Sequence, residues 1–136
     1  MRVVEVTGGR NPKFGGAESI TNEQFRASLV ATLVQSKVFR AVQTDGDSDL
    51  SLKASIVLQR QRIGSGIEYR QETIVSYEFV DNNSKKIVWH DTYQSEFGSM
   101  ALSGATRTVR ACEGSVRENL ALLLQGINER WPANAK

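Results

Sequence analysis

The chain has 136 residues, of which 40% are hydrophobic and 24% charged, and its formal net charge is +2. This length suits one domain with its own core, so we expect residues 1–136 to form a single α+β domain. The composition excludes intrinsic disorder, and the small net charge gives no support to nucleic-acid binding, which requires clustered basic residues.

The first forty residues predict a strand, a loop and a helix. Arg2–Thr7 holds three valines and favours a strand, whereas residues 10–19 contain Asn-Pro and Gly-Gly pairs and predict a loop. Thr21 and Gln24 have the spacing of a capping box, so a helix is expected to begin there. Its apolar stripe comprises Phe25, Leu29, Leu33 and either Val38 or Phe39, with Val30 and Val34 on its flank.

Three strands are predicted next, over residues 50–61, 67–80 and 86–97, with turns at 64–66 and 81–84. Their short connections predict an antiparallel meander. Alternation with period two places one set of apolar residues on a single sheet face. This set is Leu50, Leu52, Ala54, Ile56, Leu58, Val75, Tyr77, Phe79, Ile87, Trp89 and Tyr93.

A second helix is predicted over residues 105–130, and Pro132 ends it. Its apolar residues recur every three or four positions, as expected of a helix with one buried side. They are Val109, Cys112, Val116, Leu120, Leu123 and Ile127.

The predicted order is therefore β-α-β-β-β-α. The apolar face of the sheet and the apolar stripes of the two helices must each be buried against another element. This requirement indicates an α+β two-layer sandwich. We expect both helices on one face of a four-stranded, mostly antiparallel sheet. The first strand would join through a parallel, right-handed crossover. The other face would be polar and open to water or to a partner.

Catalytic and metal-binding patterns are weak. His90 is the only histidine and alternates out of phase with Trp89, so we expect it on the solvent face. Cys112 is the only cysteine and is interpreted as a small buried hydrophobic residue. Neither belongs to a spacing typical of a nucleophile or a metal site. We therefore predict no catalytic, cofactor-binding or metal-binding residues, no cofactor, and no enzymatic activity.

Two pairs of acidic residues are candidates for acid–base chemistry. They are Asp91 with Glu96 and Glu68 with Glu72. Carboxylate pairs of this kind are recognised by geometry and by shifted pKa values, and carboxylates on surface strands are common. We interpret these four as surface residues.

Basic residues form two groups, and acidic residues lie among them. Lys53, Arg60, Arg62 and Arg70 fall on the second and third strands, and Arg107, Arg110 and Arg117 fall on the last helix. If several shared a face, they could bind anionic lipid or nucleic acid. Because Glu68, Glu72, Glu113 and Glu118 alternate with them, we predict a solvated surface of mixed charge and no nucleic-acid partner.

The sequence resembles small lipoproteins of the bacterial cell envelope, in particular the LptE-like group of lipopolysaccharide-assembly lipoproteins. The resemblance rests on the order of elements and on two segments. These are residues 20–25 with Leu29, Leu33, Val38 and Phe39, and residues 113–120, which carry Glu113, Val116, Arg117, Asn119 and Leu120. The pattern of residues 50–56 and 74–80 resembles that of the strands in that group.

The resemblance implies a domain lipid-anchored to the periplasmic face of the outer membrane through an N-terminal cysteine. It implies a binding or assembly role, with an envelope protein or a glycolipid as partner and membrane contact through the anchor alone. Since Cys112 lies deep in a predicted helix, the anchoring cysteine and a signal peptide are expected upstream of Met1. The alternative is a cytoplasmic α+β ligand-binding module or an enzyme of unknown substrate, which would need a concave pocket with converging polar groups.

Overall fold

The computed structural model describes residues 2–8, 20–37, 39, 42, 49–63, 69–99 and 104–130. Within these, the side chains of residues 6–8, 20–37, 39, 42, 49–59, 71–98 and 113–130 are described. The predicted loop at 10–19, the turn at 64–66 and the helix stop at Pro132 lie outside these ranges, as do Val38, Glu68 and the side chains of Val109 and Cys112.

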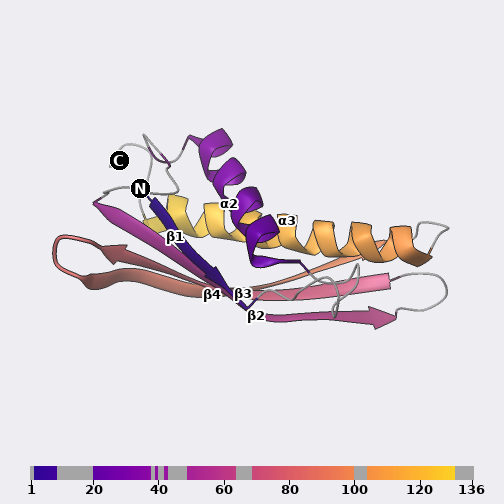
Figure 1. The fold of residues 1–136 in the computed structure, drawn as a ribbon. Coiled ribbons are helices and arrows are strands. Elements are labelled where there is room, and N and C mark those ends of the chain that lie inside the picture. The colour runs from indigo at the N-terminus through magenta and orange to yellow at the C-terminus, as the bar shows by residue number, and fades with distance from the viewer. Residues whose placement is uncertain are drawn as a thin grey trace.

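Four strands and two helices follow one another in the predicted order: β1 (Arg2–Thr7), α2 (Asn22–Ser36), β2 (Leu50–Ile63), β3 (Tyr69–Asp81), β4 (Lys86–Ser99) and α3 (Gly104–Arg130). The sheet has the order β1-β2-β3-β4, in which β1 runs parallel to β2 and the other pairs are antiparallel. Figure 1 shows α2 and α3 on the same side of the sheet. The predicted α+β two-layer sandwich is confirmed.

Helix α2 begins with the predicted capping box. The Gln24 amide donates to Thr21 Oγ1 at 3.1 Å, and the Thr21 amide donates to Gln24 Oε1 at 3.0 Å. Phe25 is fully buried, as are Leu29 and Leu33. The position predicted for Val34 was wrong, because this side chain is 53% exposed. It follows Phe25 by nine residues, about two and a half turns, and so points to the opposite side of the helix.

The centre of the core is β3, and its apolar residues share one face, as the alternation predicted. Its residues Val75, Tyr77 and Phe79 are buried against the helices. The Phe79 ring lies 5.3 Å from Trp89 and 5.9 Å from Phe39, between centroids, which is a favourable distance for aromatic pairs. Phe39 thus extends the stripe of α2 into the core.

A bulge in β2 displaces one predicted core residue. The register shifts between Ile56 and Leu58, so Leu58 leaves the core face and Gln59 takes a buried position. The Gln59 side chain then accepts a hydrogen bond of 2.9 Å from the Ile20 amide just before α2. The placement of Leu58 on the apolar face was wrong because one extra residue inverts the alternation beyond it.

A second irregularity changes the start of β4. Phe79 pairs with Trp89, but Val80 pairs with Ile87, which leaves Val88 as the extra residue. Ile87 is therefore 53% exposed, and Val88 packs against the core instead. The prediction was right for Trp89 but wrong for Ile87.

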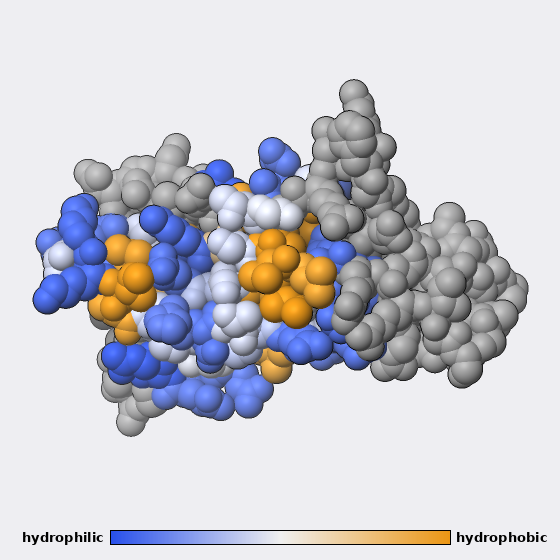
Figure 2. All heavy atoms as spheres, turned by 90° about the horizontal axis from the view of Figure 1, so that it is seen from below, coloured by the Kyte–Doolittle hydropathy of each residue, from blue (hydrophilic) through white to orange (hydrophobic). Residues whose placement is uncertain are grey.

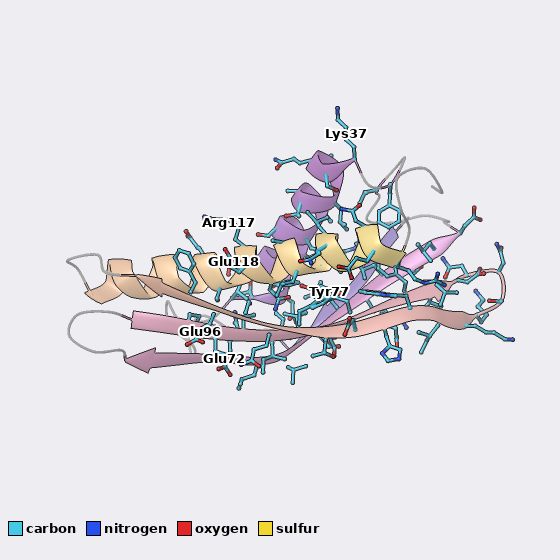
Figure 3. The ribbon with its side chains drawn as sticks, turned by 180° about the vertical axis from the view of Figure 1, so that it is seen from behind. Lys37, Glu72, Tyr77, Glu96, Arg117 and Glu118 are labelled. Atoms are coloured by element: carbon cyan, nitrogen blue, oxygen red, sulfur yellow. The ribbon has the colours of Figure 1, made fainter. Side chains whose placement is uncertain are left out.

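Helix α3 contributes its predicted apolar stripe and also a cluster of buried hydrogen bonds with the sheet, made by Asn119 and Ser115. We call this cluster the polar joint. Within the described part of the stripe, Val116, Leu120, Leu123 and Ile127 are buried. Beside them lies Asn119, which is fully buried. Tyr77 Oη donates to Asn119 Oδ1 at 2.7 Å, and Asn119 Nδ2 donates to the backbone oxygens of Tyr93 at 2.8 Å and Thr73 at 3.3 Å. Figure 3 shows Tyr77 between the sheet and α3.

One turn earlier on α3, Ser115 extends this joint. Its hydroxyl lies 2.7 Å from Thr73 Oγ1, and its backbone oxygen accepts a hydrogen bond of 2.6 Å from Ser95 Oγ. Gly114 and Gly126 permit the close approach, since a Cβ at either position would overlap Phe97 or Tyr93. The helix is thus held at one register along β3 and β4.

We expect Asn119→Ala to lower the free energy of unfolding by about 2–3 kcal/mol, because it leaves the buried Tyr77 hydroxyl and the Tyr93 carbonyl without their partner. Chemical denaturation measures the change, with Gln125→Ala, at an exposed position of the same helix, as the control. A loss no larger than that of the control would contradict a stabilising role for the joint.

Candidate binding face

The side of the sheet away from α2 and α3 is called the open face below. Where its residues are described, Figure 2 shows this face as mostly hydrophilic, with separate hydrophobic groups. One apolar residue there is Val57, which is 61% exposed, and Ile74 on the neighbouring strand is half-buried. The described part of the open face is therefore polar, as the sequence predicted, and it also carries a small apolar strip that the sequence analysis did not predict.

A row of small hydroxyl side chains crosses all four strands. The register places Thr7 opposite Ser55, Ser55 opposite Ser76, and Ser76 opposite Thr92. The Thr7 and Ser55 hydroxyls lie 3.1 Å apart, and those of Ser76 and Thr92 lie 2.6 Å apart. A hydroxyl has one donor and two acceptor positions, so each bonded pair keeps capacity for a ligand. We call these four residues the hydroxyl row.

A charged row lies directly beside the hydroxyl row. Lys53 stands opposite Glu78, and Glu78 stands opposite His90. Lys53 and His90 are exposed, which confirms the prediction that His90 faces solvent. The two rows together present cationic, anionic and neutral hydrogen-bonding groups side by side on the open face.

These rows border a shallow hollow of about 220 Å³, lined by Thr7, Lys53, Ala54, Ser55, Ser76, Tyr77, Glu78, His90 and Asp91. Small-molecule pockets usually have about 300–1,000 Å³ and mostly apolar walls. A smaller, polar hollow on an open sheet suits a ligand that lies across the surface rather than one enclosed by it.

The predicted acidic pairs are arranged differently in the structure. Asp91 stands opposite the core residue Tyr77, whereas Glu96 stands opposite Glu72 on the open face. Because the two residues are five positions apart on β4, their side chains alternate to opposite sides of the strand, and Asp91 and Glu96 do not form a pair. Glu72 and Glu96 do lie side by side (Figure 3), with Arg60 opposite Glu72 in the register. Only the pairing of the strands brings these two carboxylates together. The interpretation of Glu72 as a surface residue was wrong, because it lies on a strand that is paired on both sides and is only 3% exposed.

Of the predicted basic groups, the structure describes the side chains of Lys53 and Arg117 alone, and these two lie in different layers of the sandwich. Lys53 lies on the open face, whereas Arg117 is exposed on α3, in the other layer of the sandwich. The side chains of Arg60, Arg62, Arg70, Arg107 and Arg110 lie outside the described residues.

Two further observations concern metals and membranes. Among the described side chains, no group of three or more His, Cys, Asp or Glu residues is placed to hold a metal ion. Neither described helix has a stretch long and apolar enough to cross a bilayer.

Two tyrosines behind the hollow have raised pKa values. Burial and the neighbouring Tyr93 raise the pKa of Tyr77 well above its usual range. Burial and the Asp91 carboxylate raise the pKa of Tyr93 to about 12. Asp91 also accepts a hydrogen bond of 2.8 Å from the Thr92 amide on the edge strand β4. Both tyrosines thus remain neutral donors over the pH range in which proteins usually work.

This arrangement predicts alkaline destabilisation. The unfolded chain ionises its tyrosines near pH 10, whereas folded Tyr77 keeps its proton, so unfolding releases protons and stability falls as the pH rises above about 10. Tyr77 alone contributes a slope of up to about 1.4 kcal/mol per pH unit. We expect urea denaturation between about pH 9 and 12 to show a shallower slope for Tyr77→Phe than for the unchanged chain. Equal slopes would contradict the assignment.

No protein-family model matches the sequence, and no curated protein matches it. Solved structures do match. A protein of Xanthomonas campestris with the family model DUF330 has a TM-score of 0.67 at 12% identity, over 90% of this chain and 81% of its own. PelC of Paraburkholderia phytofirmans, solved as a dodecamer, has a TM-score of 0.57 at 15% identity, over 90% and 85%.

A third structure, a candidate lipoprotein of Caulobacter crescentus, has a TM-score of 0.54 at 13% identity, over 97% of this chain and 93% of its own. Identities this low establish the fold alone. The chain therefore has a fold found in bacterial proteins that include lipoproteins of this kind, which supports the resemblance to envelope lipoproteins at the level of fold. Membership of the LptE-like group stays a prediction.

Proposed function

We propose that this chain is the folded domain of a bacterial envelope lipoprotein, a non-enzymatic protein held by lipid at the periplasmic face of the outer membrane. It binds an envelope protein or a glycolipid through the open face. The observation that carries the proposal is the difference between the two faces of the sheet. The helices bury one face, while the other presents the hydroxyl row, the charged row and the hollow between them.

The solved neighbours support the class of protein. The Caulobacter crescentus neighbour is a candidate lipoprotein, and PelC is a dodecamer, so chains of this fold include both a lipoprotein candidate and a subunit of a larger assembly. An assembly role for the present chain agrees with both.

The first experiment tests the anchor. The complete native reading frame is expressed in a bacterial host with labelled palmitate. We expect a labelled, membrane-associated product whose label is lost when the cysteine preceding this domain is changed to serine. An unlabelled protein in the cytosolic fraction would instead favour a cytoplasmic ligand-binding module or enzyme.

The second experiment tests the open face. A photoreactive phenylalanine replaces Ser55 or Thr92 on the open face, and Gln125 or Glu129 on the exposed side of α3 as matched controls. After irradiation of living cells, we expect adducts from the first pair alone. Mass spectrometry of the adducts distinguishes a protein from a glycolipid partner. Adducts that form equally from both pairs, or from neither, would contradict binding at this face.

A further inference from the structure

Helix α2 is apolar on both of its sides. Phe25, Leu29 and Leu33 are buried against the sheet, and the opposite side carries apolar residues as well. Ala27, Ala31 and Val34 are exposed there, and Val30 is half-buried beside them. We call Ala27, Val30, Ala31 and Val34 the outer face of α2. Their spacing of three and four residues makes them one continuous surface.

This surface differs from that of an ordinary surface helix. The solvent side of such a helix normally carries charged and polar residues, because only one stripe needs to be buried. Over the middle of α2 the exposed side is uncharged, and Val34 leaves more than half of its side chain in water, at 53%. The alanines allow the backbone of another helix to approach closely. An exposed apolar surface of this kind is typical of an interaction site.

Charged residues flank the outer face and have opposite signs. Glu23 is exposed in the first turn of α2, and Lys37 is exposed at its C-terminal cap. Figure 3 shows Lys37 at the far end of α2, directed away from the sheet. Arg26, the other charged residue of this segment, follows buried Phe25 and is half-buried. The outer face is thus an apolar centre between one acidic and one basic end.

We propose that a second copy of this chain docks on the outer face, with the two α2 helices antiparallel about a twofold axis between Val30 and Ala31. Ala27 then packs against the partner's Val34, and Ala31 packs against the partner's Val30, so that a small residue always faces a larger one. Glu23 and Lys37 each lie about 10 Å from the axis, which places Glu23 beside the partner's Lys37.

The charges select this orientation. An antiparallel pair has two Glu23–Lys37 contacts, whereas a parallel pair would bring like charges together at both ends. A twofold contact also closes after two copies, because the same surface serves on each. The partner is therefore a second copy, in a dimer rather than an open chain of subunits.

The dimer is weak and depends on concentration. Stable, specific interfaces bury about 1,200–2,000 Å² in total, and one pair of four-turn helices falls at or below that range. The inference goes beyond the proposed function, since it involves the helix layer and leaves the open face free. Adducts from the open face and dimerisation through α2 can thus succeed or fail separately.

Sedimentation equilibrium over a wide concentration range tests the dimer. We expect the unchanged chain to shift from monomer to dimer as concentration rises, and Ala31→Glu to stay monomeric because it places two carboxylates at the axis. Gln125→Glu on α3 is the matched control and should behave as the unchanged chain. Circular dichroism verifies that Ala31→Glu is folded. A chain that stays monomeric up to the highest concentration would overturn the proposal.

Charge exchange tests the orientation. Glu23→Lys alone and Lys37→Glu alone should each dimerise at least tenfold more weakly, because each makes both end contacts repulsive. An equimolar mixture of the two variants should regain dimerisation, since every contact then joins opposite charges. Glu118→Lys on α3, with the same change of charge, should have no effect. If the mixture dimerises no better than either variant alone, the antiparallel arrangement is wrong.

Discussion

The alternation of β3 is the constraint on which the rest of this structure depends. This strand is paired on both sides, and its residues divide strictly between the two faces. Val75, Tyr77 and Phe79 enter the core, while Ser76 and Glu78 face outward. Burial of three large apolar side chains on one face requires a cover, and both helices must lie on that side. The opposite face of the same strand is formed by the alternating residues and is left polar.

The polar joint under α3 adds precision to this apolar packing. Hydrophobic contacts alone tolerate sliding of a helix along a sheet, because they have no preferred direction. The hydrogen bonds of Asn119 with Tyr77 and with the Tyr93 carbonyl are directional and lie in a buried site. They are satisfied at one position of the helix alone, since a shift would leave buried polar groups unpaired. Helix α3 is therefore fixed at one position along β3 and β4.

The sequence predicts those parts of the fold that depend on local periodicity. The capping box at Thr21 and the buried stripe of α2 follow from spacing, as does the core face of β3. Leu58 and Ile87 were misplaced because bulges shift the alternation, and a bulge has no clear signature in a single sequence. The hydroxyl row could not be predicted either. Thr7, Ser55, Ser76 and Thr92 are far apart in the chain and meet only through the register of three strand pairs.

The open face and the outer face of α2 lie on different layers of the molecule, so both can be occupied at once. A weak contact through α2 gains from confinement. If lipid holds two copies on one membrane, their effective concentration rises, and a contact that is marginal in solution becomes populated without any new interaction.

Anchoring from one side would also orient both copies in the same way relative to the membrane normal. A twofold axis along that normal then makes two α2 helices antiparallel when they lie in the membrane plane. The geometry that Glu23 and Lys37 select is thus compatible with two anchored copies that present their open faces outward.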